Sequence, residues 1–187
     1  MNTAEQIVEA YFRYVRKCFT ITDLKVERAN NRQIDLLAFD AIDGNGFHVE
    51  TSVTHTRWEE TLETLTDKFE KKFFGAPAPR PENESPRTDI ARGKNYFPEI
   101  CQSYRGLGLN PNTIKRAWVA WSVQGATEPI FQHQHLSSAT DNVFTIEIIS
   151  MRDCIFPSLM AEIGSSNYDH VVLRTLSLIS KWREQTS

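Results

Sequence analysis

The sequence has little cysteine and lacks the short motifs of several common chemistries. Its three cysteines, Cys18, Cys101 and Cys154, are far apart and form no CxxC pair. Neither a disulfide framework nor a zinc knuckle is supported, and a reducing cytoplasm is the simplest expectation. The sequence also lacks a GxSxG nucleophile elbow and a GxxxxGK[ST] phosphate loop, which argues against the commonest serine-hydrolase and P-loop chemistries.

Long apolar runs and a strong net charge are absent as well. No apolar run approaches the ~20 residues that cross a bilayer, so we expect no membrane partner. The first residues, MNTAEQIVEAYFRYV, carry acids in an amphipathic pattern that is wrong for a signal peptide. The net charge is −3 at pH 7, so a nucleic-acid partner must be met by a local basic patch.

The composition predicts a single domain over residues 1–187, because 40% of the residues are apolar and 24% are charged. Helical periodicity and strand-like alternation fix the expected elements. Helices are expected over 3–17, 57–74, part of 89–107, 151–163 and 169–184, and strands over 22–28, 32–40, 47–54, 115–123 and 143–150. This order predicts a mixed α/β fold, with a small central sheet flanked by helices. The Pro-rich stretch 75–88 is expected to be a mobile loop within the domain.

Two carboxylates stand in apolar strands on either side of a tight turn. Asp35 lies in IDLLAFD and Glu50 in FHVETSV, and the DGNG segment between them is a strong hairpin signal. Antiparallel pairing would place the two acids side by side. Each acid alone often faces solvent in other strands, but two buried carboxylates need a compensating cation. The pair therefore predicts a Mg²⁺ site.

The first predicted helix offers further acidic side chains. Glu5 and Glu9 are four residues apart and share one helix face. Either could supply a third carboxylate by binding metal-linked water.

With these residues, the chain resembles the PD-(D/E)XK, or restriction-endonuclease-like, nuclease superfamily over about residues 4–123. That family's pattern is an Asp, a variable gap and then Glu-x-Lys, which Asp35 and Glu50 match. The resemblance implies a Mg²⁺- or Mn²⁺-dependent nuclease that hydrolyses DNA. It also implies that Asp35, Glu50 and the backbone carbonyl of Thr51 bind the metal, with Glu9 or Glu5 completing the outer ligation.

One position departs from the family pattern, because Ser52 stands where the family has its lysine. That lysine helps position and polarise the attacking water, and serine carries no charge for this task. A basic group from elsewhere could replace it, and the candidates are His55, Lys68 and Lys72. Alternatively, the protein has lost hydrolysis and keeps the fold as a module that binds nucleic acid or a protein partner.

The region from 68 to 116 holds ten basic residues against five acidic ones. Such a surplus suits sequence-independent phosphate contacts, although an ordinary solvated surface has the same appearance. Tyr96, Phe97 and Tyr104 are interleaved with these charges and could stack on unpaired bases.

Other conspicuous side chains are assigned structural roles. His133 and His135, in FQHQH, are expected in a surface loop, because two histidines alone are a weak metal signal. Trp118 and Trp121 lie in an apolar strand and are expected in the core. The apolar last helix offers a surface through which a homodimer could form.

Overall fold

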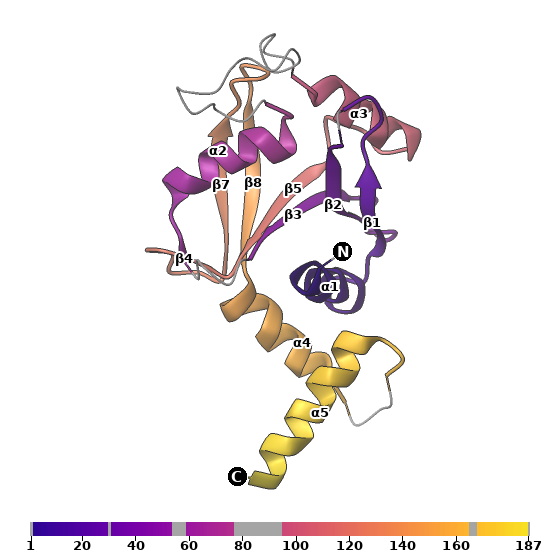
Figure 1. Ribbon diagram of the computed structural model, residues 1–187, viewed down its shortest axis with the longest axis vertical. Coiled ribbons are helices and arrows are strands. Elements are labelled where there is room, and N and C mark those ends of the chain that lie inside the picture. The colour runs from indigo at the N-terminus through magenta and orange to yellow at the C-terminus, as the bar shows by residue number, and fades with distance from the viewer. Residues whose placement is uncertain (1, 30, 54–58, 77–94, 165–167, 187) are drawn as a thin grey trace.

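A six-stranded mixed sheet forms the centre of the protein, with helices on both faces (Figure 1). The computed structural model describes residues 2–29, 31–53, 59–76, 95–164 and 168–186. Over these residues the expected mixed α/β class is confirmed.

The order of the strands in the sheet is β1-β2-β3-β5-β8-β7. The first three strands form an antiparallel meander, β5 pairs parallel with both β3 and β8, and β7 runs antiparallel to β8. A second, two-stranded sheet pairs β4 with β6 in parallel. The strands are β1 (Phe19–Lys25), β2 (Gln33–Phe39), β3 (Gly46–Ser52), β4 (Glu59–Glu60), β5 (Lys115–Ala120), β6 (Ser122–Val123), β7 (Ile130–Leu136) and β8 (Val143–Ser150).

The hairpin between β2 and β3 follows the turn chemistry of its sequence. The Asp40 carboxylate accepts hydrogen bonds from the backbone N–H groups of Ile42 (2.8 Å) and Asp43 (3.2 Å). Gly44 has a φ of 69°, in the left-handed region that glycine tolerates without strain. The turn therefore fixes the register that brings Asp35 and Glu50 together.

Helices α2 (Leu62–Phe73) and α3 (Phe97–Gly106) cover one face of the sheet (Figure 1). The apolar stripe of α2 packs Leu65, Phe69 and Phe73 against Trp118 of β5. The helix begins later than the expected residue 57, because Thr61 caps it and β4 occupies the two residues before the cap. The helix ends at Phe73 and is followed, after Phe74, by Gly75 (φ 69°), where an added Cβ would lie 2.7 Å from the Tyr96 backbone.

The opposite face is covered by the two ends of the chain. Helix α1 (Thr3–Ala10) continues into a π-helical segment, η1 (Tyr11–Val15). After β8 a second π-helical segment, η2 (Met151–Ile155), leads into α4 (Phe156–Glu162), and α5 (Val171–Thr186) follows. These helices enclose the largest apolar cluster with the even-numbered residues of β2, such as Leu36 and Ala38.

Several elements differ from the sequence-based expectations. The segment with His133 and His135 is an edge strand, β7, and not a surface loop. His135 is buried, and its Nε2 lies 2.6 Å from Glu70 Oε1 on α2. The first strand lies at 19–25 instead of 22–28. Trp118 is in the core as expected, and Trp121 packs at its margin.

The loop expected over 75–88 falls largely outside the described residues, since only its first two positions are described.

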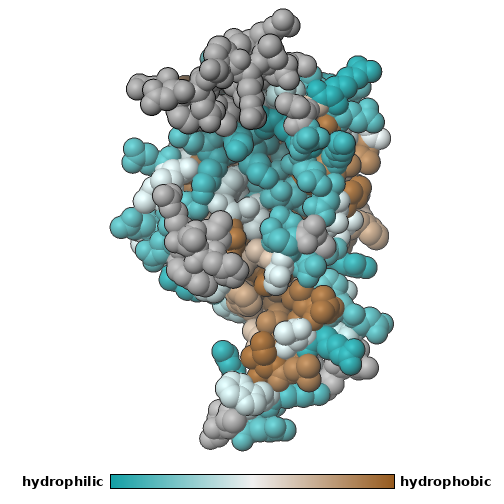
Figure 2. Space-filling model, in the orientation of Figure 1, coloured by the Kyte–Doolittle hydropathy of each residue, from teal (hydrophilic) through white to brown (hydrophobic). Residues whose placement is uncertain are grey.

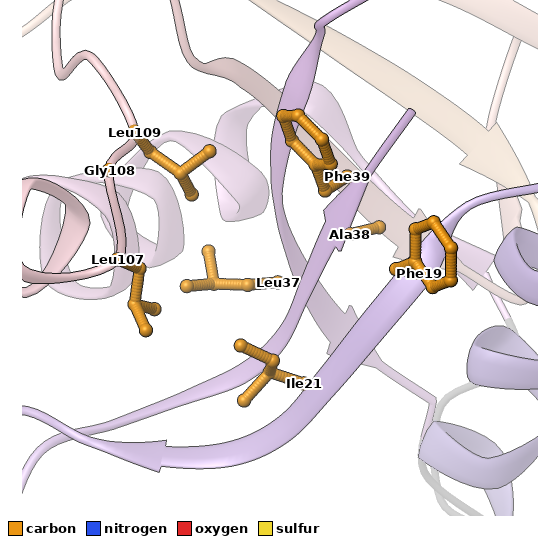
Figure 3. A pocket seen from close by; sticks show the side chains of 8 residues that line it. All are labelled: Phe19, Ile21, Leu37, Ala38, Phe39, Leu107, Gly108 and Leu109. Atoms are coloured by element: carbon orange, nitrogen blue, oxygen red, sulfur yellow. The ribbon is translucent and has the colours of Figure 1, made fainter. Parts of the chain in front are cut away.

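Among the described residues, exposed apolar side chains gather on α5 and beside the edge strand β1. The first group lies on the outer face of α5, with Val171, Leu178, Ile179 and Trp182, and Figure 2 shows apolar atoms concentrated over α4 and α5. The second group borders a hollow of about 260 Å³ at the free edge of the sheet (Figure 3), lined mainly by Phe19, Ile21, Leu37, Phe39, Leu107 and Leu109. Within the described ranges, none of the helices combines the length and the apolar character that crossing a membrane requires.

Candidate functional site

The antiparallel register of β2 and β3 brings Asp35 and Glu50 together. Leu36 pairs with Val49, so the next residues along the two strands, Asp35 and Glu50, are opposite each other. Both side chains point to the face that α2 covers, because each contacts Lys72 of that helix. The predicted convergence of the two acids is therefore present in the structure.

Lys72 lies between the two carboxylates. Its Nζ is 3.0 Å from Asp35 Oδ1 and 2.6 Å from Glu50 Oε2. The other oxygen of Asp35 accepts a hydrogen bond of 3.0 Å from the backbone N–H of Thr51. Glu50 has no exposed side-chain surface, whereas Lys72 remains 34% exposed. One ammonium group thus serves two acids at the boundary between core and solvent.

Burial and mutual repulsion shift the protonation of these acids. Burial, together with the charge of Glu50, raises the pKa of Asp35 from 3.8 to about 6, although Lys72 and the Thr51 N–H oppose the shift. Burial also raises the pKa of Glu50, against the opposing charge of Lys72. For Lys72, burial lowers the pKa, but the two carboxylates outweigh burial and raise it above its ordinary value. Lys72 therefore stays charged at neutral pH.

A buried histidine holds the second oxygen of Glu50. The His48 Nε2 lies 2.7 Å from Glu50 Oε1, and its Nδ1 lies 2.5 Å from the hydroxyl oxygen of Tyr104. Burial and the nearby charge of Arg116 lower the pKa of His48 well below its usual value. The neutral ring then donates its Nε2–H to Glu50 and accepts the Tyr104 hydroxyl at Nδ1. Glu50 is thus oriented from two sides.

A second cluster lies one helical turn earlier on α2. Lys68 Nζ donates to Ser52 Oγ at 2.8 Å and also contacts the buried carboxylate of Glu60. Glu60 additionally accepts from Ser52 Oγ (3.0 Å) and from Thr64 Oγ1 (3.1 Å). Although burial raises the pKa of Glu60, the contacts with Lys68 lower it overall. An ammonium group therefore stands beside the position where the PD-(D/E)XK pattern has lysine.

The structure does not bring Glu5 or Glu9 to this site. Glu9 Oε1 accepts from Thr20 Oγ1 at 3.0 Å, and Thr20 pairs with Ala38, which faces α1. Asp35 points to the opposite face, so the sheet separates it from Glu9. Glu5 takes part in the capping box at the start of α1 with Asn2. The expectation of a third carboxylate from the first helix is therefore wrong. His55 lies outside the described residues.

The structure also corrects the expected base-stacking surface. Tyr104 is fully buried under His48 and cannot stack on a base. Arg116 is only 4% exposed, and its guanidinium lies over the rings of Phe74 (5.1 Å), Phe97 (6.0 Å) and Phe144 (4.5 Å). Because Arg116 is buried and Lys68 and Lys72 are in ion pairs, these three basic residues are not part of a freely solvated patch.

Three important residues were not identified from the sequence. His48 shares a strand face with Glu50 two positions later, and this spacing is a usable signal. Glu60 lies in a two-residue strand that carries no periodicity. Arg116 stands in an apolar strand, where its burial follows from the aromatic rings that cover it.

Asp35 and Glu50 meet two conditions for a magnesium site, namely a pair of oxygen donors and a cation that both of them contact. Among the residues that the structure describes, no group of three or more His, Cys, Asp or Glu side chains is placed to hold a metal ion. Mg²⁺, however, commonly binds through only one or two carboxylates and keeps several water ligands. Asp35 and Glu50 supply two such oxygen donors and already share one cation, so they fit this ion. Thr51 takes part in the site through its backbone N–H, which donates to Asp35. The role of its carbonyl as a metal ligand stays a prediction.

Comparisons with known proteins add no assignment. The chain matches no protein-family model, and a search of curated proteins finds no match.

Proposed function

We propose that this protein is a Mg²⁺-dependent nuclease with a restriction-endonuclease-like core, and that it hydrolyses DNA phosphodiester bonds. The observation that carries this proposal is the convergence of Asp35 and Glu50 on one cation in the sheet interior. The order of helix, three-stranded meander, helix and parallel strand around this pair supports it. Mn²⁺ would serve in place of Mg²⁺.

Each residue of the site has a distinct role in this proposal. Asp35 and Glu50 would hold the metal, together with the carbonyl of Thr51. When bound, the metal activates water and stabilises negative charge that develops on the phosphate. His48 and Tyr104 keep the Glu50 carboxylate in a fixed orientation, which a preorganised site requires.

Lys68 would take the role of the missing family lysine. Its ammonium reaches Ser52, which holds the motif position, and Glu60 fixes it there. The side chain is 34% exposed, so the ammonium can also meet an anionic substrate. A fixed cation beside the scissile phosphate would orient the attacking water and stabilise the transition state.

One observation favours a second candidate, a non-catalytic module of the same fold that binds nucleic acid or protein. The acidic pair is already neutralised in part by Lys72. Such a module would bind no divalent ion and would show no turnover.

The test is cleavage of linear, nicked and branched DNA in the presence of Mg²⁺ or Mn²⁺. We expect cleavage by the wild type and its loss in both Asp35→Asn and Glu50→Gln. Glu9→Gln is the matched control, because it removes a carboxylate on the opposite face of the sheet and should leave cleavage intact. Thermal unfolding would verify that each variant is folded. Cleavage that survives both site substitutions would reject the assignment.

A further inference from the structure

Lys72 occupies the position that a metal ion would need. Its Nζ contacts one oxygen of Asp35 at 3.0 Å and one oxygen of Glu50 at 2.6 Å. A divalent ion held by the same oxygens would lie about 2 Å from each of them. An ammonium and a dication cannot approach these oxygens together without strong repulsion at short range. The two cations must therefore compete.

The charge of the site points to the same competition. Two carboxylates and one ammonium leave a net negative charge, which favours a cation of higher charge in place of the ammonium. Adding a dication while Lys72 stays in place would instead give a surplus of positive charge around a fully buried Glu50, and that surplus is costly in the protein interior.

Lys72 has a route out of the site. Its side chain is 34% exposed, whereas Glu50 is enclosed. The lysine stem is flexible, and its ammonium is strongly hydrated in water. Rotation of the stem would move the charge into solvent without any change in the sheet.

We propose that Lys72 is a built-in counter-cation that closes the acidic pair to divalent ions and must leave before one binds. The proposal rests on the proposed function, because it concerns the metal site of that nuclease. Lys72 stabilises the empty site and lowers its affinity for the ion, since the binding-competent arrangement is only part of the population. If the ion pairs of Lys72 were purely structural, replacing Lys72 would instead weaken the binding of every cation at this site.

The proposal is tested by titration of Mn²⁺ alone into the full-length chain. Calorimetry and electron paramagnetic resonance measure the binding. We expect Lys72→Met to bind Mn²⁺ at least tenfold more tightly than the wild type, and Lys72→Met/Glu50→Gln to lose this binding. Lys71→Met is the control, because Lys71 is the exposed neighbour on the same helix. It loses the same charge and should change the affinity less than twofold.

A second measurement does not depend on how the variants fold. In the wild type, Mn²⁺ should expose Lys72 to an amine-acylating reagent and raise its labelling severalfold in peptide mass spectrometry. The labelling of Lys71 should stay constant. Unchanged labelling of Lys72 at saturating Mn²⁺ would contradict its departure.

The outcomes separate this proposal from the proposed function. If Lys72→Met binds Mn²⁺ no more tightly than the wild type, while Glu50→Gln abolishes binding, the counter-cation role is overturned and the nuclease assignment stands. If neither the wild type nor Lys72→Met binds Mn²⁺, both proposals are overturned.

Discussion

The hydroxyl oxygen of Tyr104 lies 2.5 Å from Nδ1 of His48, and neither residue has measurable exposure to solvent. This contact connects α3 to the central strand β3. It also satisfies the one ring nitrogen of His48 that does not face Glu50. The hydrogen bond therefore helps to hold the His48 ring in the orientation in which it contacts Glu50.

Tyr104→Phe should lower the free energy of unfolding by about 1–3 kcal/mol, because it leaves a buried nitrogen without a donor. Urea denaturation followed by circular dichroism would measure the loss. Tyr14→Phe is the matched control, since Tyr14 is half-buried on the other face of the sheet, and its effect should stay below about 0.5 kcal/mol. Equal losses in the two variants would contradict the role of the Tyr104 hydroxyl.

Asp35 should make stability depend on pH between about 4 and 6. Well below its ordinary pKa of 3.8, Asp35 is protonated in both states and contributes nothing to the pH dependence. Its pKa is raised from 3.8 to about 6 in the folded chain, so over this interval the folded state binds more protons than the unfolded state. Stability then falls as the pH rises, by roughly 2–3 kcal/mol, and levels off once the pH is well above the folded pKa.

Asp35→Asn should remove this loss, so the test is the difference in unfolding free energy between wild type and variant at a series of pH values. The difference should change mainly between pH 4 and 6 and level off at higher pH. A difference that is the same at every pH would show that Asp35 has an ordinary pKa.

Arg116→Met should leave stability unchanged or raise it by about 1 kcal/mol. In the part of the chain that the structure describes, the Nε and Nη2 atoms of Arg116 have no hydrogen-bond partner, and burial lowers the pKa of its guanidinium. An apolar side chain of similar length avoids the cost of burying the charge. Arg116→Ala should instead cost about 2–4 kcal/mol, because it leaves a cavity among the three phenylalanine rings. Chemical denaturation of both variants would check the order.

Lys68→Met should reduce Mg²⁺-dependent DNA cleavage by roughly a hundredfold or more if its ammonium replaces the family lysine. Ser52→Lys in the same chain should restore part of that activity, because it returns an ammonium to the motif position. Single-turnover cleavage rates would measure both effects. A double variant no more active than Lys68→Met would argue against this role.

Phe69→Ala should destabilise the protein by about 3–5 kcal/mol. Phe69 is fully buried and contacts Phe73, Trp118 and His135. Leu107→Ala is the comparison, since Leu107 is 42% exposed at the rim of the apolar hollow, and it should cost less than about 1 kcal/mol. The midpoint of thermal unfolding would rank the two variants.

The acidic pair was predictable because local rules determine it. A hairpin signal fixes the register of two neighbouring strands, and strand alternation then fixes the face of each side chain. The positions of Asp35 and Glu50 can therefore be predicted without information from the rest of the chain. The same holds for the stripe of Leu65, Phe69 and Phe73, which follows the helical period.

The remaining parts of the site depend on contacts that local patterns do not contain. The spacing of Glu5 and Glu9 predicts a shared helix face, but the face of the sheet on which α1 packs is a tertiary property. Two histidines alone are a weak metal signal and favour a surface loop, whereas pairing with β8 and the carboxylate of Glu70 make His135 a buried strand residue. Whether Lys68 or Lys72 lies beside Ser52 depends on how far α2 reaches along the sheet.

The parallel pairing of β3 with β5 has a consequence for synthesis of the chain. Phe47 is paired with Lys115, and the whole of α2 and α3 lies between them in the sequence. The β1–β3 meander therefore leaves the ribosome with β3 as an unpaired edge and with its two acids still lacking the lysine that follows later. Because such distant pairings form slowly, we expect closure of this strand pair to limit the folding rate. The nascent meander would then be the species most in need of protection from aggregation.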